Sequence, residues 1–307
     1  MYRTSVRVLL IFPFISLTST RLFRRPEAIN SEIHDINNSN GHFGHLEDFL
    51  YGLPDGKTGR RVAEWHENMT SNPEELGSYV EGDILFPMGT GRNGLRASSA
   101  TWPNGVVPYI ISPYFDADQR KVIYEAMNDY HKYTCIRFKP YHGVETDYIR
   151  ITAGNSGCWS SVGRIGSWQN VNLQVPGCVT RKGTVIHELM HAIGFLHEQS
   201  RFERDQFVSI QWNNILNGHD SNFLKASKQT TDDFGIAYDY NSVMHYSSYA
   251  FSKNGKPTII PRTSNDYFSE VDKYFQDNVR IKLGQREGFS KGDIQKIRRM
   301  YKCNRYG

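Results

Sequence analysis

The stretch His187-Glu-Leu-Met-His191-Ala-Ile-Gly194-Phe-Leu-His197-Glu198 contains three of the chain's eleven histidines. His187 and His191 are four positions apart in a segment with helical spacing, so their side chains stack on one face of the helix. Gly194 can adopt a positive φ and end that helix, which lets His197 approach from another direction. The spacing therefore predicts that three imidazoles bind one metal ion.

The chemistry of this set favours catalysis over a structural role. Three neutral histidines around Zn²⁺ leave the fourth coordination position to water, which is typical of catalytic zinc sites. Helical geometry turns the carboxylate of Glu188 off the metal face and toward that open position. There it can accept a proton from the water, whose pKa zinc lowers to about 7, and return it to the leaving amine. We predict a zinc hydrolase with one Zn²⁺ per chain and Glu188 as general base.

Length and composition set broad limits. The 307 residues suffice for one or two domains with a buried core. Aromatic residues make up 13% of the chain, which argues against disorder. The net charge is only +4, and lysine and arginine are spread along the chain. Because nucleic-acid binding needs a concentrated basic surface, no nucleic-acid partner is predicted.

The N-terminus has the pattern of a secretory signal. Arg3 and Arg7 precede a mostly apolar run over residues 8–17, and small residues come after it. A membrane anchor is the alternative, but about ten apolar residues are too few for a bilayer, which needs about 20. We expect a signal peptide over residues 1–20, secretion, and no stable membrane anchor.

Residues 21–92 differ in composition from the rest of the chain. The first part is rich in Asn, Ser, His and Gly, and the region holds two possible N-glycosylation acceptors, Asn37 and Asn68. It ends in a glycine-rich stretch that favours proteolytic nicking. We expect a pro-segment over 21–92, cut between Arg92 and Asn93 by an activating protease. An ordinary linker is the alternative.

Residues 93–307 carry the patterns of one compact domain. Strand patterns occur at 106–111, 136–138, 148–151 and 171–175. Three helical patterns occur. The first follows a cap at Asp116 and runs to about 133, the second covers 184–193, and the third follows a cap at Ser290 and runs to 301. Because the strands gather mainly before the central helix, we predict an α+β fold.

The four cysteines are Cys135, Cys158, Cys178 and Cys303, and none forms a Cys-x-x-Cys pair. In a secreted chain an even number with this spacing predicts two disulfides. Three pairings are possible, and spacing does not choose among them.

Residues 187–205, HELMHAIGFLHEQSRFERD, resemble the astacin family of metzincin zinc endopeptidases, whose pattern is HExxHxxGFxHExxRxDRD. Glu203 is the single departure, since the family usually has Asp there. Ser242-Val-Met-His-Tyr246 resembles the Met-turn of that family, SxMHY. The resemblance covers nearly all of 93–303. It implies a secreted zymogen with a single, two-lobed protease domain: a mixed twisted sheet with two long helices, then a mostly irregular lobe with a terminal helix.

The resemblance also implies roles that spacing alone does not. Met244 would form an apolar floor beneath the histidines, although from composition it is simply a core residue. Tyr246 would bind zinc in the free enzyme and swing away to stabilise the oxyanion, whereas by itself it is a packing tyrosine. The implied disulfides are Cys135–Cys303 and Cys158–Cys178.

The pro-segment resembles that of the family too. Glu81-Gly-Asp83 is similar to the motif FxGD, whose Asp binds zinc and displaces the catalytic water. Val80 stands where Phe is usual, and a simple Gly-Asp turn is the alternative. Glu198 matches the residue that fixes the new N-terminus, here Asn93, after activation.

Two other function classes stay open at this point. A secreted, non-catalytic zinc-binding or interaction protein of the same fold would be marked by loss of Glu188 or a ligand, and none is lost. A zinc exopeptidase acting on small peptides is the third reading. The site favours an endopeptidase with protein or peptide substrates.

Overall fold

The computed structural model describes residues 51–87, 101–262 (except 227, 229 and 230) and 281–303. The predicted signal peptide, Asn37, Arg92 and Asn93 lie outside the described residues. Asn68, the second glycosylation candidate, is described and exposed.

A five-stranded sheet in the order β4-β3-β5-β7-β6 organises the first part of the domain. All its pairs are parallel except β6 with β7. The strands are β3 (Val106–Ile111), β4 (Arg137–Pro140), β5 (Ile149–Thr152), β6 (Cys158–Ser160) and β7 (Gln169–Leu173). Since β6 pairs only with β7 within this sheet, it is an edge strand of the sheet.

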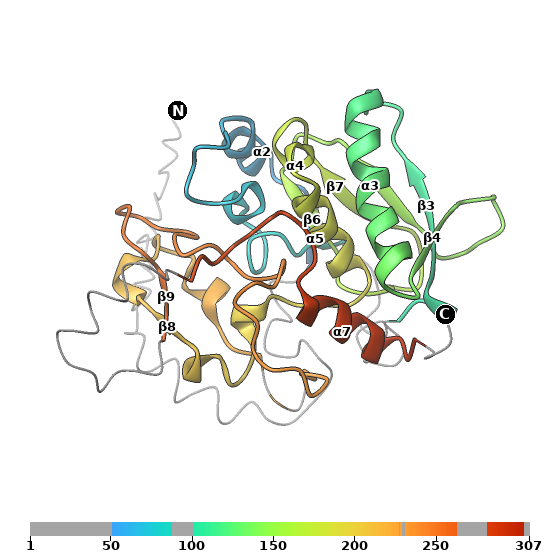
Figure 1. The fold of residues 1–307 in the computed structure, drawn as a ribbon. Coiled ribbons are helices and arrows are strands. Elements are labelled where there is room, and N and C mark those ends of the chain that lie inside the picture. Colours follow the sequence, from blue (N-terminus) through green and yellow to red (C-terminus); the bar gives the residue numbers. More distant parts are fainter. Residues whose placement is uncertain (1–50, 88–100, 227, 229–230, 263–280, 304–307) are drawn as a thin grey trace, which may run out of the picture. The chain divides into compact units, whose positions relative to one another are not determined.

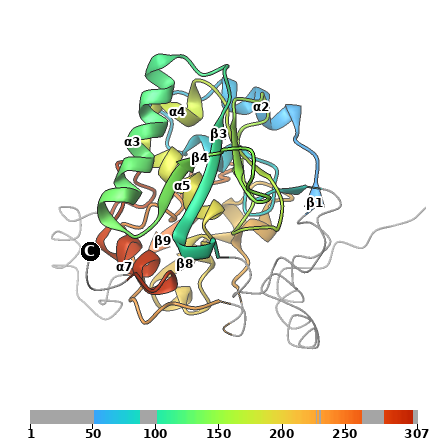
Figure 2. The same cartoon turned by 90° about the vertical axis from the view of Figure 1, so that its right-hand side faces the viewer.

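Two helices pack on this sheet, α3 (Ala117–Tyr133) and α5 (Lys182–Ala192). Figures 1 and 2 show them side by side on the same face of the sheet. Asp116 caps α3 as predicted, because its side chain accepts a hydrogen bond from the backbone N–H of Gln119. Ile123 of α3 and Leu189 of α5 are fully buried with the sheet in one core. A short α4 (Gly177–Thr180) precedes α5.

The predicted strand over 171–175 begins earlier than expected, at Gln169, and ends at Leu173. Gln169 is a polar residue that the alternation rule does not place in a strand. It is nevertheless fully buried, and its side-chain amide donates a hydrogen bond to the carbonyl of Gly163. A tertiary hydrogen bond therefore overrides the hydrophobic pattern here.

The remainder of the domain is mostly irregular. Its strands are β8 (Val208–Ile210) and β9 (Ile259–Pro261), an antiparallel pair. A second apolar cluster fills this part and includes Phe223, Tyr246 and Phe251. The terminal helix α7 (Lys291–Met300) is capped by Ser290, as predicted. The α+β fold predicted from the sequence is confirmed.

The N-terminal described segment has little regular structure: β1 (Tyr51–Gly52), α2 (Gly56–Ala63) and β2 (Phe86–Pro87). Asp55 caps α2, and a 3₁₀ turn runs over Pro73–Leu76. Despite its irregularity, much of 73–86 is buried.

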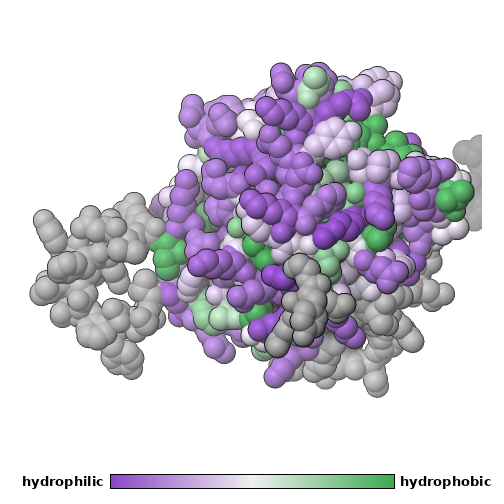
Figure 3. Space-filling view, turned by 45° about the vertical axis from the view of Figure 1, so that its right-hand side comes forward, coloured by the Kyte–Doolittle hydropathy of each residue, from purple (hydrophilic) through white to green (hydrophobic). Residues whose placement is uncertain are grey.

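The face shown in Figure 3 is mainly hydrophilic, with apolar residues scattered over it. Among the described residues, no helix combines the length and the apolar character needed to cross a membrane.

Two disulfides close loops of different length. Cys135–Cys303 spans 168 residues and Cys158–Cys178 spans 20. These are the pairs that the resemblance implies. Cys135 lies just beyond the cap residue Thr134 of α3, and Cys303 lies shortly after α7, so the longer bridge joins the terminal helix to the first core.

Removal of the longer bridge is expected to cost more stability. In the loop-entropy model, replacing Cys135 and Cys303 by Ala should lower the free energy of unfolding by about 2 kcal/mol more than replacing Cys158 and Cys178. Denaturant unfolding of the two double variants measures this difference. Equal losses would contradict the prediction.

Candidate metal centre

Helix α5 and the turn after it bring the three histidines together. His187 and His191 are fully buried on α5. Gly194 has a φ of 115°, which ends the helix, and a Cβ there would lie 2.7 Å from Cε of Met300. The positive φ favours glycine, whereas the flexible end of Met300 could move to make room for a Cβ. After this turn the chain places His197, which is 1% exposed, beside His187 and His191.

Asp83 of the N-terminal segment is the fourth member of this cluster. One ligand atom from each of Asp83, His187, His191 and His197 lies within 4.8 Å of the others. The Asp83 carboxylate is 3.0 Å from Nε2 of His187, 3.2 Å from Nε2 of His197 and 3.4 Å from Nε2 of His191.

The donor set fits zinc. Oδ1 of Asp83 and Nε2 of His191 are buried with no hydrogen-bond partner among the described residues. Such orphaned atoms are costly unless something binds them. Three imidazole nitrogens and one carboxylate oxygen are ligands that tetrahedral Zn²⁺ accepts. These are the residues that the sequence predicts as ligands in the precursor.

The outer nitrogen of each imidazole has its own partner. Nδ1 of His187 lies 2.8 Å from the carbonyl of Val243, and Nδ1 of His191 lies 2.7 Å from the carbonyl of Phe195. Nδ1 of His197 lies 2.7 Å from Oε2 of Glu81. Such contacts fix the tautomer and direct Nε2 toward the metal.

The Asp83 carboxylate is held in its charged form. Burial by itself raises the pKa of Asp83, but the charges of His197 and His191 outweigh burial and hold that pKa well below its ordinary value. The same pairing raises the pKa of His197 to about 9 against the effect of burial. An anion in this position is therefore favoured by positive charge around it.

Glu188 lies next to the first histidine and is fully buried. Neither carboxylate oxygen has a hydrogen-bond partner among the described residues. Burial raises the pKa of Glu188 well above its ordinary value, and the charge of Asp83 raises it further. An unpaired carboxyl beside a metal cluster is expensive and marks a functional position.

The segment 242–246 supports the cluster through its backbone. The carbonyl of Val243 accepts from His187, and the carbonyl of Met244 accepts from the N–H of Glu198. Met244 itself is 1% exposed in the main core. Asp293 of α7 anchors the turn, since it accepts hydrogen bonds from the hydroxyl of Ser242 and the N–H of Val243.

Tyr246 contacts the N-terminal segment. Its hydroxyl donates a hydrogen bond to the carbonyl of Glu81. Its ring lies 4.6 Å from that of His197, centroid to centroid. His245 next to it is not in the cluster: its ring nitrogens bond the carbonyl of Tyr246 and the hydroxyl of Tyr238.

Glu198 is already paired in this structure. Its carboxylate contacts Lys296 of α7, Arg201 and the N–H of Asp239. Glu203, the departure from the family pattern, forms a hydrogen bond with Arg201, 2.8 Å long from Nε. Glu203, whose side chain is longer than the usual Asp, thus pairs with Arg201.

The N-terminal segment pairs with the outer edge of β6. Ile84 pairs with Ser160 in parallel, and the N–H of Ser160 donates to the carbonyl of Asp83. Gly82 has a φ of 86°, and a Cβ there would lie 2.7 Å from the ring of Phe251. The glycine of the motif is therefore required by space as well as by conformation.

Two acidic residues that sequence reasoning missed attach the same segment. Glu74 pairs with Arg286, and both side chains are fully buried. Glu75 accepts hydrogen bonds of 2.6 Å from the N–H and from the hydroxyl of Ser247. The one available signal was acidic residues in a helical turn after proline, which is also typical of an ordinary helix start.

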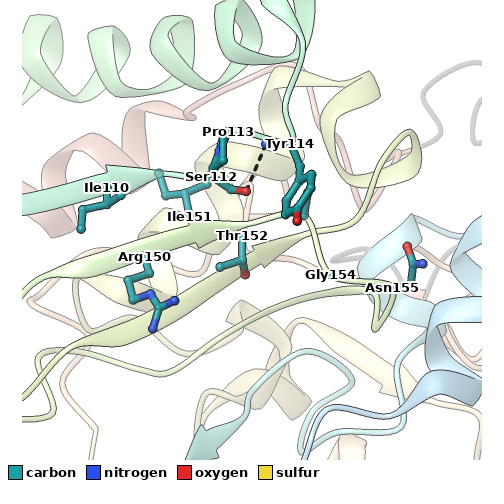
Figure 4. A pocket seen from close by; sticks show the side chains of 10 residues that line it. Ile110, Ser112, Pro113, Tyr114, Arg150, Ile151, Thr152, Gly154 and Asn155 are labelled. Carbon is teal, nitrogen blue, oxygen red and sulfur yellow. Dashed lines mark hydrogen bonds between the residues drawn. The ribbon is translucent and has the colours of Figure 1, made fainter.

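A hollow of about 600 Å³ lies elsewhere, beyond the ends of β3 and β5 (Figure 4). Its lining includes Tyr114, Arg150 and Asn155, and none of the four cluster residues. It is not part of the candidate metal centre.

Comparison with known proteins agrees with this geometry. The sequence model of the astacin peptidase family matches residues 94–302. Zinc metalloproteinase nas-13 of Caenorhabditis elegans is 43% identical over 77% of this chain and 49% of its own length. Astacin-like metalloendopeptidase of Mus musculus is 40% identical over 75% of this chain and 49% of its own length.

A solved structure is also similar. High choriolytic enzyme 1, a hatching enzyme zinc-protease from Oryzias latipes, has a TM-score of 0.58 and 36% identity. The match covers 67% of this chain and 96% of that one. The chain belongs to the astacin family, and zinc is its cofactor. It spans about half the length of the first of the curated relatives it matches.

Loss of one histidine should weaken zinc retention. In the precursor His191→Ala leaves two imidazoles and Asp83, and we expect the zinc content after gel filtration to fall well below one ion per chain, because the tetrahedral site loses one of its four protein ligands. Elemental analysis after gel filtration measures this. His66→Ala, an exposed position in the N-terminal segment, is the control and should keep its zinc.

Proposed function

We propose that this protein is a secreted zinc endopeptidase made as a latent precursor. The observation that carries the proposal is the convergence of Asp83 on the three histidines, with the unpaired carboxyl of Glu188 beside them. Its substrates are proteins or peptides. Family membership supports this class, and the natural substrate stays open.

The residues divide the chemistry among them. His187, His191 and His197 hold the zinc, which when bound acts as a Lewis acid and lowers the pKa of water to about 7. Glu188 accepts the proton of the attacking water and delivers it to the leaving amine. Tyr246 donates its hydroxyl hydrogen bond to the oxyanion.

Latency follows from the N-terminal segment. Asp83 takes the position that the catalytic water needs. The carbonyl of Glu81 accepts the hydrogen bond of the Tyr246 hydroxyl, so this donor is not available to an oxyanion. Departure of Asp83 removes a negative charge near Glu188. That charge is, after burial, a cause of the raised pKa of Glu188, so its removal lowers this pKa.

Activation requires a cut by another protease near Arg92, between the pro-segment 21–92 and the domain 93–307. The family match beginning at residue 94 supports this boundary. Glu198 would bind the new N-terminus at Asn93. Because Lys296 already contacts the Glu198 carboxylate, the new ammonium group has to share that carboxylate with Lys296 or displace Lys296 from it. Met244 serves as the floor of the site.

Secretion is proposed from the signal pattern over 1–20 and is supported by the two disulfides, which persist in oxidising compartments. No stable membrane anchor is proposed. Asn37 and Asn68 are the proposed glycosylation sites, and exposure supports Asn68.

Glu188→Gln separates catalysis from metal binding. The amide keeps the shape of the side chain but does not accept a proton, so kcat/KM of the activated enzyme should fall about 10²–10⁴-fold while the zinc content is unchanged. Cleavage of a quenched fluorescent protein substrate and elemental analysis provide the two readouts. Full activity in the variant would favour a different base. An activated wild type that holds zinc and cuts nothing would favour the non-catalytic binding protein.

Asp83→Ala tests the latency mechanism. The variant lacks the carboxylate at the zinc, so the uncut precursor should hydrolyse substrate measurably, whereas the wild-type precursor stays silent. Glu64→Gln, an exposed carboxylate of the same segment, is the matched control. If the Asp83→Ala precursor is as silent as wild type, steric cover by the segment suffices and Asp83 is not the switch.

A further inference from the structure

The three imidazoles differ in where their outer nitrogens find support. His187 and His191 use the backbone carbonyls of Val243 and Phe195, which stay in the protease domain. His197 instead uses the side-chain carboxylate of Glu81, 2.7 Å from Nδ1. Glu81 belongs to the segment that activation is proposed to remove. Of the three hydrogen-bond partners at Nδ1, one therefore belongs to the segment that activation is proposed to remove.

Both the backbone and the side chain of Glu81 are fixed by contacts. Its backbone carbonyl accepts the hydroxyl of Tyr246, and its side chain is buried against His197. Its φ is 46°, in the left-handed region that non-glycine residues seldom adopt. A strained backbone persists where the surroundings impose it, and here it delivers a carboxylate to a buried imidazole.

The contact is specific in direction. Nε2 of His197 faces the cluster, 3.2 Å from Asp83. When Nε2 binds zinc the ring is neutral, and its hydrogen is then on Nδ1. Glu81 accepts that hydrogen bond. A carboxylate in this position orients the ring and makes the other nitrogen a stronger metal ligand.

We propose that Glu81 is a positioning residue for zinc, so that the pro-segment strengthens metal binding while Asp83 blocks the site. The inference rests on the proposed function, because it takes His197 as a ligand and the segment as removable. It adds a second task for the segment: the precursor keeps its zinc through secretion by a carboxylate–histidine–zinc contact that is lost on activation.

Zinc affinity of the intact precursor tests the proposal. It is measured by competition with a chromophoric chelator, for wild type, Glu81→Gly and Glu81→Gln. Glycine suits the positive φ and keeps the backbone carbonyl, so it removes the side chain with its carboxylate and leaves the contact with Tyr246. We expect zinc to bind about 10–100-fold more weakly in Glu81→Gly. Glu81→Gln retains an acceptor and should restore most of the affinity. Glu64→Gln should equal wild type.

The substitutions lie in the pro-segment, which gives an internal control. After cleavage and removal of the segment, wild type and both Glu81 variants yield the same chain and must bind zinc equally. The proposal is overturned if the Glu81→Gly precursor binds zinc as tightly as wild type. It is also overturned if that precursor is proteolytically active, because the segment has then left the site. A wild-type precursor without stoichiometric zinc would refute the metal centre itself.

Discussion

Burial of three imidazoles at one point is the constraint on which the rest of the structure depends. Each ring has to present Nε2 to the centre, and each buried Nδ1 needs a hydrogen-bond acceptor, since an unmet one costs about 1–3 kcal/mol. The Gly194 turn, the Val243 carbonyl and the Phe195 carbonyl all serve this purpose. Asp293 of α7 fixes the turn over 242–246, and Cys135–Cys303 fixes the end of α7. Segments far apart in sequence are thus joined around one small volume.

Charge governs how the N-terminal segment occupies this volume. Asp83 enters a cluster that favours an anion, while Glu74 meets Arg286 with both side chains fully buried. Breaking a buried ion pair by removing one partner costs about 3–5 kcal/mol. The segment is therefore attached by polar contacts, by an edge pairing at Ser160, and by apolar packing of Ile84 and Phe86 in one buried cluster and of Tyr79 and Leu85 in another.

Local sequence information predicts the regular elements well where capping and periodicity agree. Asp116 and Ser290 cap the helices that the pattern indicates, and the strand over 106–111 has the expected bounds. The strand at Gln169 begins outside its expected range because a side-chain hydrogen bond stabilises a buried polar residue. Glu81, Glu74 and Asp293 were not identified as site residues, because each acts on a partner more than 45 positions away.

The sequence by itself determined which residues can bind zinc, since the spacing of two histidines on a helix and a glycine before the third are local properties of the chain. It also pointed to the general base and, through family resemblance, to Asp83 and Tyr246. Only the tertiary structure decided what surrounds them: which acceptor each Nδ1 receives, that the Tyr246 hydroxyl donates to the carbonyl of Glu81, and that Glu198 already pairs with Lys296. The physical reason is that hydrogen bonds and ion pairs depend on distance in space, which neither periodicity nor spacing along the chain encodes.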